Sequence, residues 1–126
     1  MPFDAETVER PEVALSPRYN ALWGEVLAWL DRGGDETARF NMCRWQSDCG
    51  TACCIGGYAM QMIGRGVLDW PEVGDALGMS REDSRRLFFM FGVPDEAPVM
   101  WHVTPAIAAR VCRHWIATGK VDWSIQ

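Results

Sequence analysis

Residues 40–63 read FNMCRWQSDCGTACCIGGYAMQMI and hold four of the five cysteines of the chain. We interpret them as an extended segment over 40–42, a tight loop, and a helix from about Thr51 to Ile63. Thr51 can accept a hydrogen bond from a first-turn amide, and Gly50 gives the backbone freedom just before it. Almost every later residue is apolar, which predicts a helix that is buried on most sides and central to the fold.

Helix signals continue on both sides of this stretch. Ser16-Pro17 and Thr104-Pro105 each combine an N-cap with a proline at the first helical position. Ser80 is followed three residues later by an acidic residue, a pattern typical of a capped helix start. A shorter helix is expected over Glu72 to Leu77, where Gly78 would stop it. Apolar residues at helical spacing follow the first and last of these starts, so both helices should bury one face.

The C-terminal residues Val121, Trp123 and Ile125 alternate with polar ones, which indicates a strand. We expect this strand to pair with residues 40–42. The predicted fold class is therefore mainly α, a single compact domain of about five helices with a minor two-stranded β element. Residues 1–15 are expected to be a flexible N-terminal arm and residues 16–126 a single globular domain.

The chain has 126 residues, a net charge of −5 and a pI of about 4.9. Such a charge repels phosphate backbones and anionic membranes and attracts basic protein surfaces. No export signal or apolar run of membrane-spanning length is visible, so we expect a cytoplasmic protein with reduced thiols. Seven tryptophans are many for this length, and several are expected at a binding surface.

Two short motifs and the end of the chain carry a resemblance to a group of small phage and bacterial proteins. Their pattern runs F-[ND]-M-x-x-W, then C-G-T-x-x-C-[IL]-[AG]-G, and ends with T-G-x-V-D-W. The motif residues here are Phe40, Asn41, Met42, Trp45, Cys49, Gly50, Thr51, Cys54 and Gly57, and residues 118–123 match the ending. The resemblance implies a compact, mainly helical fold and a phage origin. It implies no particular activity.

A second resemblance, to bacteriocin-processing cysteine peptidases, rests on residues 46–53. It implies Cys49 as a nucleophile and Gln46 as an oxyanion donor, and His102 would have to act as the base. A cysteine at a helix N-terminus does have a lowered pKa. However, His102 is followed closely by a helix start, so the second half of such a site is missing or very different. Buried structural cysteines are the favoured interpretation, and a thiol hydrolase is the alternative.

The sequence also offers two alternatives, a zinc site and a DNA-binding motif. Cys43, Cys49, Cys53 or Cys54 and His102 could supply four zinc ligands, but no C-x-x-C pair supports them. We therefore expect no metal and no cofactor.

Residues 73–87 have the residue spacing of a DNA-binding helix-turn-helix. Acidic residues at the start of its second helix, and Ser84 where a buried aliphatic residue is expected, argue against this alternative.

These observations favour a non-enzymatic interaction protein whose partner has a basic surface. The candidate binding residues are large or acidic: Glu82, Asp83, Asp95, Glu96, Met100, Trp101 and His102. Together with the phage resemblance, they suggest a protein that binds and inhibits a host protein, such as a nucleic-acid-handling defence component. Binding to nucleic acid or membranes is disfavoured, and the oligomeric state is left open.

Overall fold

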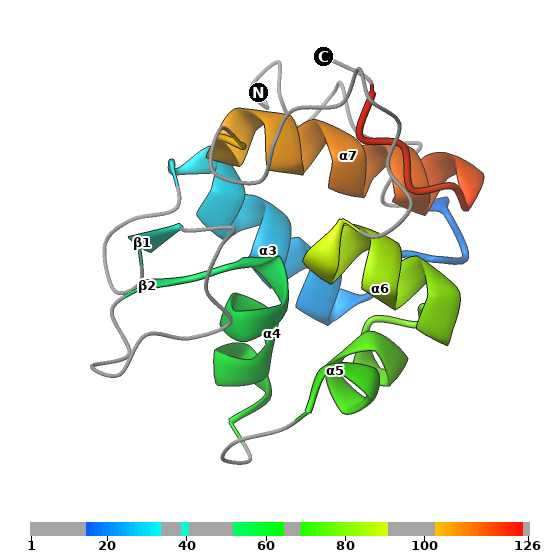
Figure 1. Cartoon of the computed structure of the whole chain (residues 1–126), viewed down its shortest axis with the longest axis horizontal. Helices are drawn as coiled ribbons and strands as arrows, with labels where there is room; N and C mark the ends of the chain where they lie inside the picture. The colour runs from blue at the N-terminus through cyan, green and yellow to red at the C-terminus, as the bar shows by residue number, and fades with distance from the viewer. Residues whose placement is uncertain (1–14, 34–38, 41–51, 65–68, 91–102, 125–126) are drawn as a thin grey trace.

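The computed structural model describes residues 15–33, 39–40, 52–64, 69–90 and 103–124 (Figure 1). These residues form five helices: α3 (Ala21–Asp31), α4 (Ile55–Ile63), α5 (Trp70–Ala76), α6 (Arg81–Phe89) and α7 (Pro105–Thr118). Two short strands, β1 (Arg39–Phe40) and β2 (Ala52–Cys53), pair in parallel. The predicted mainly α class is confirmed.

The helices pack in a chain of neighbours around one apolar core. Helix α3 contacts both α7 and α4, α4 contacts α5, and α5 packs on α6. In Figure 1, α7 crosses the top of the view, and α4 and α5 lie at the opposite end. Every helix supplies buried side chains to this core, among them Trp23, Ile55, Val73, Leu87 and Val111.

The N-cap of α3 is Asn20, not Ser16 as predicted. The Asn20 side chain accepts a hydrogen bond from the Trp23 amide at 3.0 Å and so caps the helix. The Ser16 hydroxyl instead donates to the carbonyl of Ile116 at 2.6 Å, near the end of α7. Arg18 joins it there, donating to the same carbonyl at 2.9 Å and to that of Ala117 at 3.0 Å. The segment before α3 therefore caps carbonyl groups at the C-terminal end of α7.

Helix α4 begins at Ile55, four residues later than the predicted start at Thr51. Ala52 and Cys53 form β2 instead, with Cys53 opposite Phe40 of β1. Strand pairing engages the backbone here, and the helix can begin only after it, with Cys54 at the N-cap position. The predicted central placement is confirmed, because residues 54–60 are all buried. Gly64 ends the helix in the left-handed conformation, at φ 74°.

The predicted C-terminal strand is not formed over residues 121–124. The amide and the hydroxyl of Ser124 donate to the same Asp122 carboxylate oxygen, which creates a turn. These hydrogen bonds lower the pKa of Asp122. Trp123 is buried, and its indole Nε1 donates to the carbonyl of Arg86 at 2.8 Å. The alternating pattern thus reflects the burial of Trp123 against α6 and not strand pairing with residue 40.

The other predicted caps are confirmed. Ser80 accepts from the Asp83 amide at the start of α6, and Thr104 accepts from the Ile107 amide at the start of α7. Helix α5 starts at Trp70, two residues before the predicted Glu72, because Asp69 and Glu72 form a reciprocal capping box.

Candidate functional site

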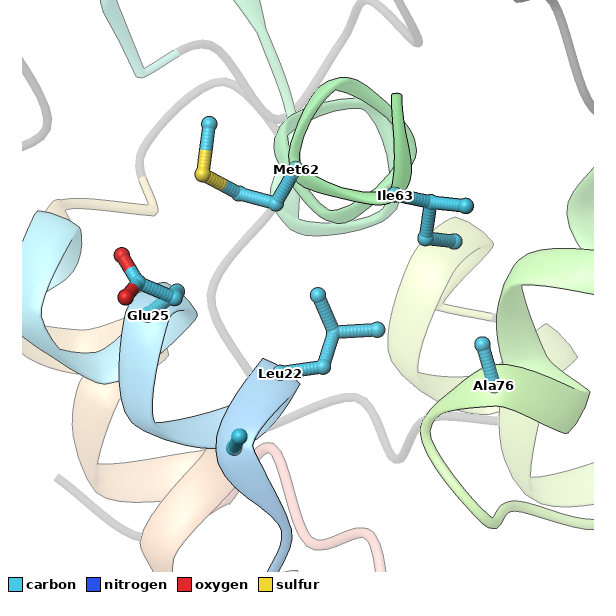
Figure 2. Close-up of a pocket in the computed structure, with 6 residues that line it drawn as sticks. Leu22, Glu25, Met62, Ile63 and Ala76 are labelled. Atoms are coloured by element: carbon cyan, nitrogen blue, oxygen red, sulfur yellow. The ribbon is translucent and has the colours of Figure 1, made fainter. Parts of the chain in front are cut away.

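An open groove lies between α3, α4 and α5 and has a volume of about 580 Å³. Its lining comes from Ala21, Leu22 and Glu25 of α3, Met62 and Ile63 of α4, and Ala76 of α5. Figure 2 shows the Leu22 side chain pointing from α3 into the space below Met62 and Ile63. Glu25 lies on the Met62 side of this space and Ala76 on the Ile63 side. The groove is therefore apolar inside, with one carboxylate at its edge.

Met62 is the most exposed of the groove's large apolar side chains, at 41% of its full accessible area. It occupies the last turn of α4, which ends at Gly64. Leu22 and Ile63 are half-buried and pack against the core below. Leaving a flexible thioether in water is unfavourable, so the groove keeps apolar surface available that a partner could bury.

Two hydrogen bonds fix the relative position of the groove walls. The Asn20 side-chain amide donates to the carbonyl of Ala76 at 3.1 Å, and the Trp23 indole donates to that of Leu77 at 2.9 Å. Both acceptors lie at the C-terminal end of α5, where helical carbonyls have no partner within the helix. The start of α3 thus caps α5, and the groove is held by hydrogen bonds as well as by packing.

Two of the three lining helices, α3 and α5, are acidic, and α4 has no charged residue. Their charged residues are Glu25, Asp31, Glu72 and Asp75, and these helices contain no lysine or arginine. Asp31 pairs with Arg113 at 2.6 Å and Asp75 with Arg81 at 3.8 Å, while Glu72 accepts from the Asp69 amide. Among the ion pairs of the described residues, none includes Glu25. Within the described part of the chain, the carboxylate at the groove edge thus has no ion-pair partner.

Of the binding residues suggested by the sequence, the structure describes only Glu82 and Asp83. Glu82 pairs with Arg86 at 2.7 Å on the surface of α6, and Asp83 accepts from the Trp115 indole at 3.1 Å. Neither lines the groove. Asp95, Glu96, Met100, Trp101 and His102 lie outside the described residues, as do Asn41, Met42, Trp45, Gln46, Cys49, Gly50 and Thr51 of the motif stretch. Phe40 is in β1, and Cys54 and Gly57 are at the buried start of α4.

Sequence reasoning missed the groove. Leu22 belongs to the apolar face predicted for the helix after Ser16-Pro17, and Met62 and Ile63 belong to the helix predicted to be buried on most sides. The signal that could have indicated exposure is the position of Met62 and Ile63 directly before Gly64, where the helix ends.

Most of the tryptophans that the structure describes are core residues, while Trp45 and Trp101 lie outside the described residues, so a binding-surface role for several tryptophans stays a prediction. Four are buried and Trp70 is half-buried against Phe89: the buried ones are Trp23, Trp29, Trp115 and Trp123. Trp29 stacks on Tyr58 with ring centroids 4.1 Å apart. Their indole rings therefore contribute to stability, and the groove presents aliphatic side chains instead.

The two thiols that the structure describes are buried and free, at Cys54 and Cys112. Burial raises the pKa of Cys54 to about 11, although hydrogen bonding to the amides of Gly57 and Gly56 acts in the opposite direction. Burial also raises the pKa of Cys112. Both thiols are thus protonated and poorly nucleophilic at neutral pH, as a structural role requires.

We predict that Cys54 in the folded protein reacts with iodoacetamide at pH 8 at least about 100-fold more slowly than in urea. A pKa of about 11 leaves roughly a thousandth of the thiol ionised at that pH, and burial blocks access as well. Peptide mass mapping over time measures the rate. Cys112 serves as a second buried thiol in the same sample, and rapid labelling of native Cys54 would contradict the assignment.

The helix pair α5–α6 is held by an unusually close contact. Ser84 is buried, and its hydroxyl donates to the Ser80 carbonyl at 2.8 Å while facing Gly74 of α5. The small pair Gly74–Ser84 thus occupies the place where an aliphatic residue was expected. Glu82 and Asp83 remain in the first turn of α6, which is unfavourable for approach to DNA phosphates.

Within residues whose side chains are described, no three His, Cys, Asp or Glu groups are placed to share a metal ion. Among the helices of those same residues, none has the length and apolar character needed to span a membrane.

No protein-family model, curated protein or solved structure matches the chain. Function is therefore inferred from the groove and its charges.

Proposed function

We propose that this chain is a non-enzymatic protein-binding domain that recognises its partner through the groove of α3, α4 and α5. The observation that supports the proposal is the exposure of Met62 beside half-buried Leu22 and Ile63 in an open groove of about 580 Å³. Apolar surface gathered in a hollow is typical of interaction sites. Methionine suits such a site because its unbranched side chain adapts to the shape of a partner.

The charge of the chain favours a basic partner. The net charge is −5. Helices α3 and α5 of the groove carry four carboxylates, and none of the three groove helices has a lysine or arginine. Such a surface speeds encounter with basic proteins and slows approach to DNA, RNA and anionic membranes. We therefore propose a basic protein surface as the partner, and the cytoplasm as the location stays part of the proposal.

The resemblance to phage proteins extends the proposal to inhibition of a host protein. Host defence components that handle nucleic acid expose basic surfaces where phosphates bind. An acidic protein bound at such a surface would compete with the nucleic acid. This role is supported by the charge, the small size and the resemblance of residues 40–57 and 118–123.

The substitution Met62→Glu tests the proposed function. We expect it to reduce specific capture of a partner from bacterial lysate by at least about tenfold, because it places a charge on apolar surface that the complex would bury. Quantitative mass spectrometry of the captured proteins measures the effect. Met62 is already exposed, so the free energy of unfolding should change by less than about 1 kcal/mol.

Leu15→Glu is the matched control, since Leu15 is 83% exposed and does not line the groove. It adds the same charge and should leave capture unchanged. If Met62→Glu retains the partner, or if the wild-type chain enriches no specific protein, the proposed function is wrong.

A further inference from the structure

We propose that the groove takes one amphipathic α-helix of the partner, with an apolar row inserted between Leu22 and Met62 and a lysine or arginine paired with Glu25. This inference rests on the proposed function and specifies the partner segment. Three features carry it: the helical walls of the groove, its apolar lining, and a carboxylate at its edge that forms no ion pair with the residues that the structure describes.

The helical walls of the groove favour a helical partner segment over an extended one. All six lining residues belong to α3, α4 or α5, and five of them are apolar. Backbone N–H and C=O groups within a helix are already hydrogen-bonded, and the Ala76 carbonyl at the end of α5 is bound by Asn20. The groove therefore offers no open backbone edge to which an extended peptide could add a strand. It recognises side chains, and an amphipathic helix presents apolar side chains in one row at i, i+3 or i+4 and i+7.

The carboxylate of Glu25 indicates that the partner helix should carry a positive charge. Glu25 lies one turn from Leu22 and Ala21 on the same face of α3, so it stands beside the apolar lining. It belongs to none of the ion pairs of the described residues, whereas Asp31, Asp75 and Glu82 each have an arginine. A helix with a basic residue flanking its apolar row would pair with Glu25 as its apolar side chains enter the groove.

Charge also disfavours two other occupants. Residues 1–14 of the same chain carry four carboxylates, Asp4, Glu6, Glu9 and Glu12, against the single arginine Arg10. A second copy of the chain would, in a two-fold symmetric contact, bring the same acidic surface against itself. Both arrangements place like charges at the groove edge, which a basic partner helix avoids.

The experiment uses the full chain and two synthetic helical peptides of about four turns each. Both peptides carry the same leucine row, flanked by lysine in one and by glutamate in the other. Calorimetry gives the affinities, and amide chemical shifts locate the bound peptide. We expect the lysine peptide to bind at least about tenfold more tightly than the glutamate peptide, with shifts gathered at α3 and the end of α4.

The charge reversal Glu25→Lys should weaken binding of the lysine peptide by about tenfold or more and improve binding of the glutamate peptide. Glu82→Lys is the matched control. It changes the net charge equally on an exposed helix residue outside the groove, and its effect should stay below about twofold, as expected for screened distant charges.

Three results would overturn the inference: equal affinity for both peptides, shifts centred away from the groove, or equal effects of the two charge reversals. Dimerisation seen by analytical ultracentrifugation, with shifts at the groove, would assign the groove to a second copy instead. If Met62→Glu abolishes capture of a cellular partner while the lysine peptide does not bind, the proposed function stands and the basic helix is rejected. If neither effect is seen, both are rejected.

Discussion

Replacing Trp23 with alanine is expected to lower the free energy of unfolding by about 3–5 kcal/mol, a large part of the stability of a domain this size. Trp23 has no exposed area, and its ring packs on Trp115 with centroids 5.6 Å apart. Its indole N–H also donates to the carbonyl of Leu77 at the end of α5. The substitution removes a core side chain and a helix cap together, and urea denaturation measures the combined loss.

Trp23→Phe separates the two contributions. Phenylalanine keeps an aromatic ring in the core but cannot donate to the Leu77 carbonyl, so we expect a loss of about 1–3 kcal/mol. Trp70→Phe provides a comparison at a half-buried position and should cost less. A loss below about 1 kcal/mol for Trp23→Ala would show that α3 and α5 do not depend on this indole.

Replacing Gly74 with alanine is expected to destabilise the fold by about 1–3 kcal/mol, although alanine is the better helix former by about 1 kcal/mol. A Cβ at this position would overlap the Ser84 hydroxyl oxygen and lie 3.0 Å from the Ser84 Cβ. Ser84 is buried within α6 and cannot move aside without shifting that helix. Helix propensity therefore predicts a gain in stability and packing predicts a loss. The measured free energy of unfolding distinguishes the two.

Gly24→Ala is the matched control for Gly74→Ala. It makes the same change inside α3, but the new Cβ would meet the hydroxyl end of the Tyr19 side chain, which can rotate away. We expect a smaller loss, or a gain. Adding Ser84→Gly to the Gly74→Ala variant should recover part of the lost stability. Stabilisation by Gly74→Ala alone would mean that α5 and α6 are not in close contact.

Local signals in the sequence predicted local structure well. Ser80 and Thr104 were correctly identified as helix caps because a capping side chain bonds to an amide only three residues away. Ser16-Pro17 has the same pattern but does not start α3, because the Ser16 hydroxyl bonds to a carbonyl 100 residues away. The start of α4 was misplaced for a similar reason, since β2 forms through pairing with β1. A short window of sequence carries no information about contacts between residues that are far apart in the chain.

The groove could not be predicted from periodicity. A helical pattern identifies the apolar face of α3 and the apolar length of α4, but it does not say whether another element covers them. Leu22, Ile63 and Met62 all fit the pattern of core residues, and only the packing of α5 beside them leaves a hollow. Composition also cannot show which tryptophans are buried, because the indoles of Trp23 and Trp123 donate to carbonyls at the end of α5 and on α6.

The contact between Ser16, Arg18 and the last turn of α7 has a consequence for biosynthesis. The donors precede their carbonyl acceptors by 98 to 100 residues. At roughly 5–20 residues per second, a translating ribosome synthesises the donors about 5–20 s before it synthesises those acceptors. During this interval Trp23 has no Trp115 to pack against. A chain stalled before residue 115 would therefore present an open apolar surface to chaperones, and native packing would close only after α7 leaves the exit tunnel.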